Sequence, residues 1–304
     1  MSGKKKIAVN RKNKVKKTGA DLALDIIAIV LGVLVSFVAL YPLWYILVAS
    51  FSRPYYVSNG EVLFMVKEFT LAAYQRAFST TNVWRGYANT IFITVAGVAV
   101  SMFFSTTLAY ALSKPKLKGC RFFVFMLMFT MWFSAGTIPF YQTLRSYKLT
   151  DSYWGLIIAF AINSYNVIIL RSFFEQVPHD FEEAAQIDGA STFRIFGQIY
   201  LPLSKAALAT VTLFYMVSRW NGYFWASILL TTESKQPLQV VLKKLLIEQK
   251  ELTENAGAVT AETLTAPVTI SYAIIVISII PMLIVYPFIQ KYFKSGVTLG
   301  GVKS

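Results

Sequence analysis

The sequence predicts an all-α membrane protein whose chain crosses the bilayer six times. Of its 304 residues, 56% are hydrophobic and only 14% are charged, about half the charged share of an ordinary soluble domain, which is roughly 25%. Six long segments carry almost no charge, and a membrane-spanning helix needs about 20 such residues in a row. Basic residues gather in alternate connecting segments, as is typical of short cytoplasmic loops. This composition excludes disordered, collagen-like and disulfide-stapled chains.

The six predicted spans lie between charged segments and form one membrane domain, residues 22–293. Arg219 is a charge well inside the fifth of them. The second span is rich in small residues, which suit close helix contacts in lipid. The third meets Pro139 near its end, where a helix normally stops or bends. The predicted spans are residues 26–50, 87–113, 122–141, 152–171, 205–231 and 267–290.

The distribution of basic residues places both termini in the cytoplasm. A basic tail, residues 1–21, precedes the first span, and the connection between the second and third spans adds Lys114, Lys116, Lys118 and Arg121. We interpret the lysines of the tail as contacts to anionic lipid headgroups rather than to nucleic acid. The first apolar run is too long for a cleaved signal peptide. The sequence therefore predicts a multi-pass plasma-membrane protein with a second cytoplasmic tail, residues 294–304.

One external connection, residues 233–266, predicts a helix. Its apolar residues recur with helical spacing between Leu238 and Leu252, and lysines occupy the other side of the helical wheel. Such a helix would lie on the membrane face or beneath a partner. Residues 254–266 are small and polar, and we expect them to form a protruding loop.

The cytoplasmic connection between the fourth and fifth spans, residues 174–204, predicts two short helices joined by a glycine turn. Asp180 suits the N-cap of the first helix and Gly189 its end, while Ser191 suits the N-cap of a second helix that stops at Pro202. A helix lying on the bilayer would normally carry lysines on its polar face. This one is acidic, which favours docking to a protein.

The same connection carries a family signature. Glu183-Ala184-Ala185 is followed, after three intervening residues, by Gly189 and, after nine further intervening residues, by Ile199-x-Leu201-Pro202. This pattern resembles the EAA motif of inner-membrane permease subunits of ATP-binding-cassette importers. Beyond the motif, the chain looks like the sugar branch of that family, the MalG-type permeases, and most like the Gram-positive subgroup for complex oligosaccharides. That likeness rests on Trp220-Asn221, Tyr286-Pro287-Phe288, Gln290-Lys291-Tyr292-Phe293 and the glycine-rich end.

The resemblance implies a type I importer with the MetI-like fold, in which the EAA segment is a coupling helix seated in a cleft of the ATPase. It implies a heterodimer with a second permease subunit, two copies of an ATP-binding subunit that hold ATP and Mg, and an extracellular lipoprotein-type solute-binding protein that delivers an oligosaccharide. The implied coupling residues are Glu182, Glu183, Ala184, Ala185, Ile187, Asp188, Gly189 and Ala190.

The sequence contains no GxxxxGK[ST] phosphate-binding loop, so we expect this chain to be a transport subunit without its own ATP site, cofactor or enzymatic activity. Cys120 is its single cysteine and His179 its single histidine. One residue of each type forms neither a disulfide nor a Cys/His metal site.

Passage of a sugar needs aromatic faces for stacking and amides for hydroxyl groups. Aromatic residues of this kind are also typical of membrane interfaces. Arg219, beside them, either binds a carboxylate of an acidic sugar or extends its charge to the outer interface. The candidate pathway residues are Trp132, Asn163, Tyr165, Asn166, Trp220, Asn221, Tyr223 and Trp225, together with Arg219.

Three other classes compete with an oligosaccharide permease. A permease for a non-sugar substrate would share the coupling segment. A secondary transporter leaves that segment unexplained and would normally carry ionisable residues inside its spans. A membrane enzyme would need a cluster of His, Cys or carboxylate residues, which the predicted spans lack.

Overall fold

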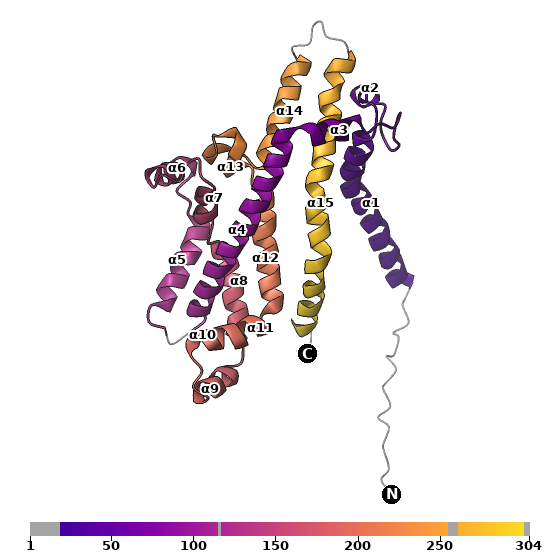
Figure 1. The fold of residues 1–304 in the computed structure, drawn as a ribbon. Helices are drawn as coiled ribbons and strands as arrows, with labels where there is room; N and C mark the ends of the chain where they lie inside the picture. The colour runs from indigo at the N-terminus through magenta and orange to yellow at the C-terminus, as the bar shows by residue number, and fades with distance from the viewer. Residues whose placement is uncertain (1–18, 115–116, 255–260, 301–304) are drawn as a thin grey trace.

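The computed structural model describes residues 19–114, 117–254 and 261–300, and within these ranges every regular element is helical (Figure 1). One isolated bridge pairs Ser52 with Phe69. Three predicted features lie partly outside the described residues: the basic tail (1–18), the tip of the external loop (255–260) and the end of the C-terminal tail (301–304).

Among the described residues, three helices are long and apolar enough to cross a membrane alone, and three bent helix pairs raise the number of candidate spans to six. The long helices are α1 (Gly19–Ser50), α4 (Thr81–Leu112) and α15 (Ala261–Gly300). The bent pairs are α5 (Cys120–Trp132) with α6 (Thr137–Ser146), α7 (Tyr153–Ala159) with α8 (Ser164–Glu175), and Thr192–Leu203 with α12 (Lys205–Trp220).

The predicted third span, residues 122–141, is not one helix. α5 ends at Trp132, and the chain bends by 120° before α6 begins. The bend passes through Gly136, whose φ of 83° and ψ of 172° lie in a region that is open almost exclusively to glycine. Pro139 lies in the first turn of α6 and does not end the span, because the N–H groups of a first turn have no partner within the helix.

The last two predicted spans also differ from the structure. α12 ends at Trp220, and the short helix α13 (Phe224–Leu229) follows after a break. α15 continues beyond residue 290 as far as Gly300, so the predicted C-terminal tail begins as an extension of the last helix.

The predicted amphipathic helix is α14 (Leu238–Glu254), and it packs against this chain's own α4 and α15. Leu238, Val241 and Leu242 form a buried cluster with Ile274 of α15. The backbones of α4 and α14 come close because Gly86 lacks a side chain: a Cβ there would lie 3.1 Å from the Leu238 Cα. Apolar residues of the helix thus find partners within the same fold.

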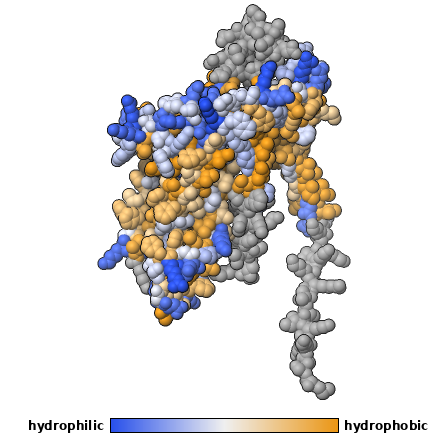
Figure 2. All heavy atoms as spheres, in the orientation of Figure 1, coloured by the Kyte–Doolittle hydropathy of each residue, from blue (hydrophilic) through white to orange (hydrophobic). Residues whose placement is uncertain are grey.

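The surface of the molecule matches a membrane environment. Figure 2 shows hydrophobic residues across the middle of the visible face and hydrophilic residues at its two ends. The side chains along most of α1 are apolar and exposed, such as Val35 and Val38. The short helices α2 (Pro54–Ser58) and α3 (Ala72–Ser79) pack on α15 at the end of the molecule opposite α9 (His179–Ile187), which is the external end because basic residues concentrate on the side of α9.

Candidate functional site

A cavity of about 770 Å³ opens between two helix breaks, the one between α7 and α8 and the one between α12 and α13. Asn163 begins α8 as its N-cap: its side chain accepts a hydrogen bond from the Asn166 N–H at 3.1 Å. The hydroxyl of Tyr215, on α12, makes two hydrogen bonds. It lies 2.6 Å from Ser105 Oγ, and it accepts a hydrogen bond from the Asn163 backbone N–H at 3.0 Å. A polar network thus fixes the wall of the cavity.

Most of the predicted pathway residues line this one cavity. Phe160, Phe214, Tyr215, Ser218 and Phe224 line it too, although the sequence analysis did not select them. Those on α12 could have been found from their spacing, since residues 214, 215 and 218 share one helical face. The predicted residues that line the cavity are Asn163, Tyr165, Asn166, Arg219, Asn221, Tyr223 and Trp225.

Two predicted pathway residues lie elsewhere. Trp220 is buried, packs edge-on against the Tyr87 ring and donates its indole N–H to the Ser278 carbonyl at 3.1 Å. It therefore joins α12 to α4 and α15. Trp132 stands at the end of α5 with 83% of its surface exposed and does not reach the cavity. Beyond the bend at Gly136, Phe140 of the same predicted span packs against Phe160 and Trp225, two residues that line the cavity.

Arg219 points into the protein, so the prediction that its charge extends to the outer interface is wrong. Its guanidinium donates to the carbonyl oxygens of Leu156 (2.6 Å), Ile157 (3.1 Å) and Phe160 (2.7 Å). These carbonyls lie at the end of α7, where a broken helix leaves acceptors without helical partners. Gly97 makes room for the guanidinium, since a Cβ there would lie 3.0 Å from Arg219 Cζ.

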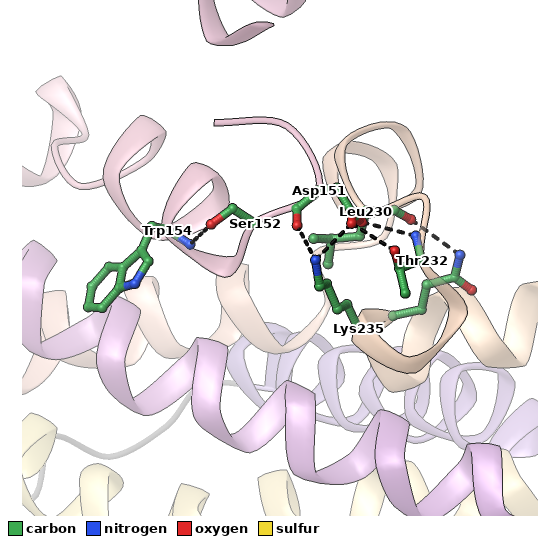
Figure 3. A network of polar contacts seen from close by, with 7 residues as sticks. Asp151, Ser152, Trp154, Leu230, Thr232 and Lys235 are labelled. Carbon is green, nitrogen blue, oxygen red and sulfur yellow. Dashed lines mark hydrogen bonds and ion pairs between the residues drawn. The ribbon is translucent and has the colours of Figure 1, made fainter. Parts of the chain in front are cut away.

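A second polar cluster joins the segment before α7 to the segment after α13 (Figure 3). Thr232 donates to both carboxylate oxygens of Asp151, at 2.9 Å from its backbone N–H and 2.7 Å from its hydroxyl. Lys235 Nζ lies 2.7 Å from Asp151 Oδ2. Lys235 and then Thr232 hold the pKa of the Asp151 carboxyl well below its usual value. We call these three residues the external clasp, because they connect the start of α7 to the segment after α13.

The cytoplasmic connection forms the predicted knob of two short helical segments at the opposite end of the molecule (Figure 1). α9 (His179–Ile187) ends at Asp188, and Gly189 follows with a φ of +76°, as expected for a glycine just past a helix end. Pro178, not Asp180, occupies the N-cap of α9. Ser191 caps α10 (Thr192–Ile195) as predicted, accepting from the Arg194 N–H at 3.4 Å.

The second part of the knob does not stop at Pro202. A π-helix (Phe196–Tyr200) follows α10 and leads into α11 (Leu201–Leu203), and the chain then bends by 84° into α12. The π-turn lies directly before Pro202, whose missing N–H interrupts the regular hydrogen-bond ladder. The proline therefore alters the helix without ending it.

The two sides of α9 have different environments. Ile187 and, beyond the turn, Phe193 are each 87% exposed, and Glu183 is exposed as well. Large apolar side chains that project into water mark a docking surface. On the other side, Glu182 Oε2 lies 2.6 Å from Lys114 Nζ and accepts the Tyr200 hydroxyl at 2.7 Å. Of the remaining predicted coupling residues, Ala184, Asp188 and Gly189 are exposed, whereas Ala185 and Ala190 pack on the core.

The environment of Glu182 keeps its carboxyl ionised. Burial acts to raise the pKa of this carboxyl, but the hydrogen bonds from Lys114 and Tyr200 outweigh burial and hold the pKa below its usual value. Among the described residues, no group of three or more His, Cys, Asp or Glu side chains could hold a metal ion.

Comparison with known proteins identifies the family. The profile of the binding-protein-dependent transport system inner membrane component matches residues 122–299. The chain belongs to this family. The permease is 41% identical over 266 residues to Protein LplC of Bacillus subtilis (strain 168), covering 88% of this chain and 90% of that protein.

Two further relatives are informative. The polygalacturonan/rhamnogalacturonan transport system permease protein YtcP of Bacillus subtilis (strain 168) is 40% identical, over 88% of this chain and 93% of that one. A chain in the crystal structure of a bacterial ABC transporter involved in the import of the acidic polysaccharide alginate is 44% identical and superimposes with a TM-score of 0.82, covering 91% of this chain and 99% of that one.

Membership of the family settles several predictions. The permease has the MetI-like fold and is a multi-pass protein of the plasma membrane. It is a transport subunit of an ABC importer and works with an ATPase and a solute-binding protein. The family thus excludes the secondary-transporter and membrane-enzyme alternatives.

Proposed function

We propose that the permease forms half of the translocation pathway for an oligosaccharide that an extracellular lipoprotein-type binding protein delivers. It pairs with a second permease subunit, and two copies of an ATP-binding subunit drive the cycle. The observation that carries this proposal is the cavity, which gathers the side chains of three asparagines and several aromatic residues at two helix breaks.

The chemistry of the cavity fits a sugar. Tyr165, Tyr223 and Trp225 offer aromatic faces to the apolar side of sugar rings, and Asn163 and Asn221 offer amide groups to hydroxyls. A metal cation or a proton would instead call for carboxylates, and no described residue lining the cavity is Asp or Glu. The names of YtcP and of the alginate transporter refer to polysaccharides, which supports a sugar over a non-sugar substrate.

The knob would couple ATP hydrolysis in the partner subunits to movement of this chain. The sequence lacks a phosphate-binding loop, so ATP and Mg would bind in the ATP-binding subunits. The exposed side of α9, with Glu183 and Ile187, together with Phe193, would dock on that subunit. ATP-driven closure of two such subunits would then move the knob and open the cavity alternately to the two sides.

Reconstituted transport tests this proposal. The full complex in proteoliposomes should import labelled oligosaccharides only with ATP and the loaded binding protein. Asn221→Ala and Trp225→Ala should each reduce import about tenfold, the effect of losing roughly 1.4 kcal/mol of contact. Trp154→Ala is the matched control, because Trp154 is an exposed aromatic residue on α7 that does not line the cavity.

Two results would count against the proposal. Import of amino acids or phosphate with no import of any oligosaccharide would replace the substrate class. Equal loss of import in Trp154→Ala and Trp225→Ala would show that the cavity is not the pathway. A panel of neutral and uronic oligosaccharides in the same assay would also identify which kind is carried.

A further inference from the structure

We propose that Lys114, Glu182 and Tyr200 form a link that carries movement of the docking helix α9 to the walls of the cavity. This inference rests on the proposed function, because it assigns a path for the coupling on which that function depends. The three residues come from three different elements. Lys114 follows α4, Glu182 lies on α9, and Tyr200 ends the π-helix that leads to α12.

The link is closed and partly withdrawn from water. Lys114 Nζ lies 2.6 Å from Glu182 Oε2 and donates to the Tyr200 hydroxyl at 2.7 Å, and that hydroxyl donates to Glu182 at 2.7 Å. The side chains of Lys114 and Glu182 are only 21% and 16% exposed. Each of the three groups therefore contacts both of the others. A withdrawn, charge-assisted triangle of this kind resists separation far better than an exposed ion pair.

Aromatic rings hold the lysine in place. Its ammonium lies 4.0 Å from the centroid of the Tyr200 ring and 4.5 Å from that of Tyr110, which is one turn earlier on α4. The Tyr110 and Tyr200 rings pack edge to face at 4.9 Å. Cation–π contacts of this kind favour one position of the charge. The end of α4 is thus tied to the knob by charge, hydrogen bonds and ring packing together.

The helices beyond the link reach the cavity. α4 packs along both α12 and α8, and Ser105 of α4 is joined to Tyr215 of α12 by a hydrogen bond of 2.6 Å. Ile93 of α4 lines the cavity, as do Tyr215 and Arg219 of α12. A displacement of α9 that passes to Lys114 and Tyr200 therefore acts on α4 and α12, two helices whose residues line the cavity.

The two sides of α9 therefore have different functions. Glu183 and Ile187 remain exposed for the ATPase, whereas Glu182 faces the link. Glu182 is accordingly a positioning residue that acts through α4 and α12, and not a contact to the ATPase. This assignment differs from the resemblance-based expectation, in which all the acidic residues of the segment serve docking.

The test is the number of sugar molecules imported per ATP hydrolysed by the complete complex in proteoliposomes. Lys114→Met should lower this ratio about tenfold, the size of a coupling energy of roughly 1.4 kcal/mol. Lys114→Arg, which keeps a cation over the rings, should restore most of it. Lys118→Met is the matched control, since Lys118 is an exposed lysine of the same connection, and it should behave as wild type.

A double variant separates transmission from mere stability. Replacing both charges in Lys114→Met/Glu182→Met avoids a buried unpaired charge, so the complex should regain thermal stability, while the ratio should stay low. Recovery of the ratio together with stability would overturn the proposal, as would a wild-type ratio in Lys114→Met. If the wild-type complex itself imported no sugar, the proposed function would fail first and the link would lose its role.

Discussion

At the scale of single residues, Arg219 shows how a charge inside a span is accommodated. A continuous helix would have satisfied the carbonyls of Leu156, Ile157 and Phe160, but α7 ends there. In lipid no water replaces the missing partners. The guanidinium carries several donors in a fixed plane and so serves these acceptors together with Ser101 Oγ at 3.1 Å. Arg219 thus supplies the donors that the carbonyls at the end of α7 lack, and this stabilises the helix break beside the cavity.

This role predicts the effect of removing the charge. Arg219→Met should lower the stability of the purified complex by roughly 2 kcal/mol or more, because several buried carbonyls lose their donor. A thermal-unfolding series in detergent measures this, with Arg219→Lys expected to recover part of the loss. Arg145→Met, an exposed arginine on α6, is the control. A variant with unchanged stability that had lost only the import of acidic sugars would instead assign Arg219 to the ligand.

At the scale of helices, the breaks distinguish this protein from a bundle of six straight spans. The external clasp of Asp151, Thr232 and Lys235 joins the segments bordering α7 and α13, and the Asp151 N–H donates to the Leu229 carbonyl at 2.7 Å. Two short helices that would be marginal alone are thereby held in fixed relation. The clasp thus links α7 and α13, both of which contribute residues to the lining of the cavity.

The clasp predicts a dependence on pH. The pKa of Asp151 is lower in the folded than in the unfolded state, so its stabilisation is complete above the usual aspartate pKa of about 3.9 and is lost as the pH falls further toward the folded value. Asp151→Asn should therefore lower the melting temperature more at pH 7 than at pH 3, where part of the stabilisation by the carboxylate has already been lost. Lys244→Met, which removes the exposed pair of Lys244 with Glu233, is the control. An equal effect of Asp151→Asn at both pH values would contradict this role.

At the scale of the whole molecule, the two polar ends serve different partners. The knob with α9 lies at one end of the molecule, and α6 and α13 lie toward the other (Figure 1). The clasp adjoins α13, because Thr232 and Lys235 follow that helix in the chain. The link and the clasp thus bracket the cavity from opposite sides, while α4 runs the length between them. An importer needs this separation, because ATP is supplied inside and the solute arrives from outside.

The orientation can be measured directly. In a Cys120→Ser background, Tyr147→Cys should react with a membrane-impermeant maleimide added to intact cells, because Tyr147 is 72% exposed at the external end of α6. Lys118→Cys should react only after the membrane is opened, since basic connections stay in the cytoplasm. The opposite pattern of labelling would reverse the topology.

How much of this protein's structure the sequence predicts depends on how far apart along the chain the interacting residues lie. The membrane class, the six crossings and the EAA knob follow from residues close together in the chain: apolar runs, charge counts, Gly189 and the Ser191 cap. Most of the predicted pathway residues do line the cavity, because their chemistry is visible without coordinates. The bend at Gly136 was missed, since an apolar run looks the same whether it is straight or broken.

The sequence by itself determined that this chain is a membrane protein, how many times it crosses the bilayer and which cytoplasmic segment docks on the ATPase. Hydropathy and short motifs are local properties of the chain, so they can be read without coordinates. Only the tertiary structure decided the partners of its polar groups. Arg219 meets Ser101 across 118 positions of sequence and Lys114 meets Glu182 across 68. Such pairings depend on how the helices pack, because a polar side chain inside a membrane protein takes whichever partner packing brings within hydrogen-bonding distance.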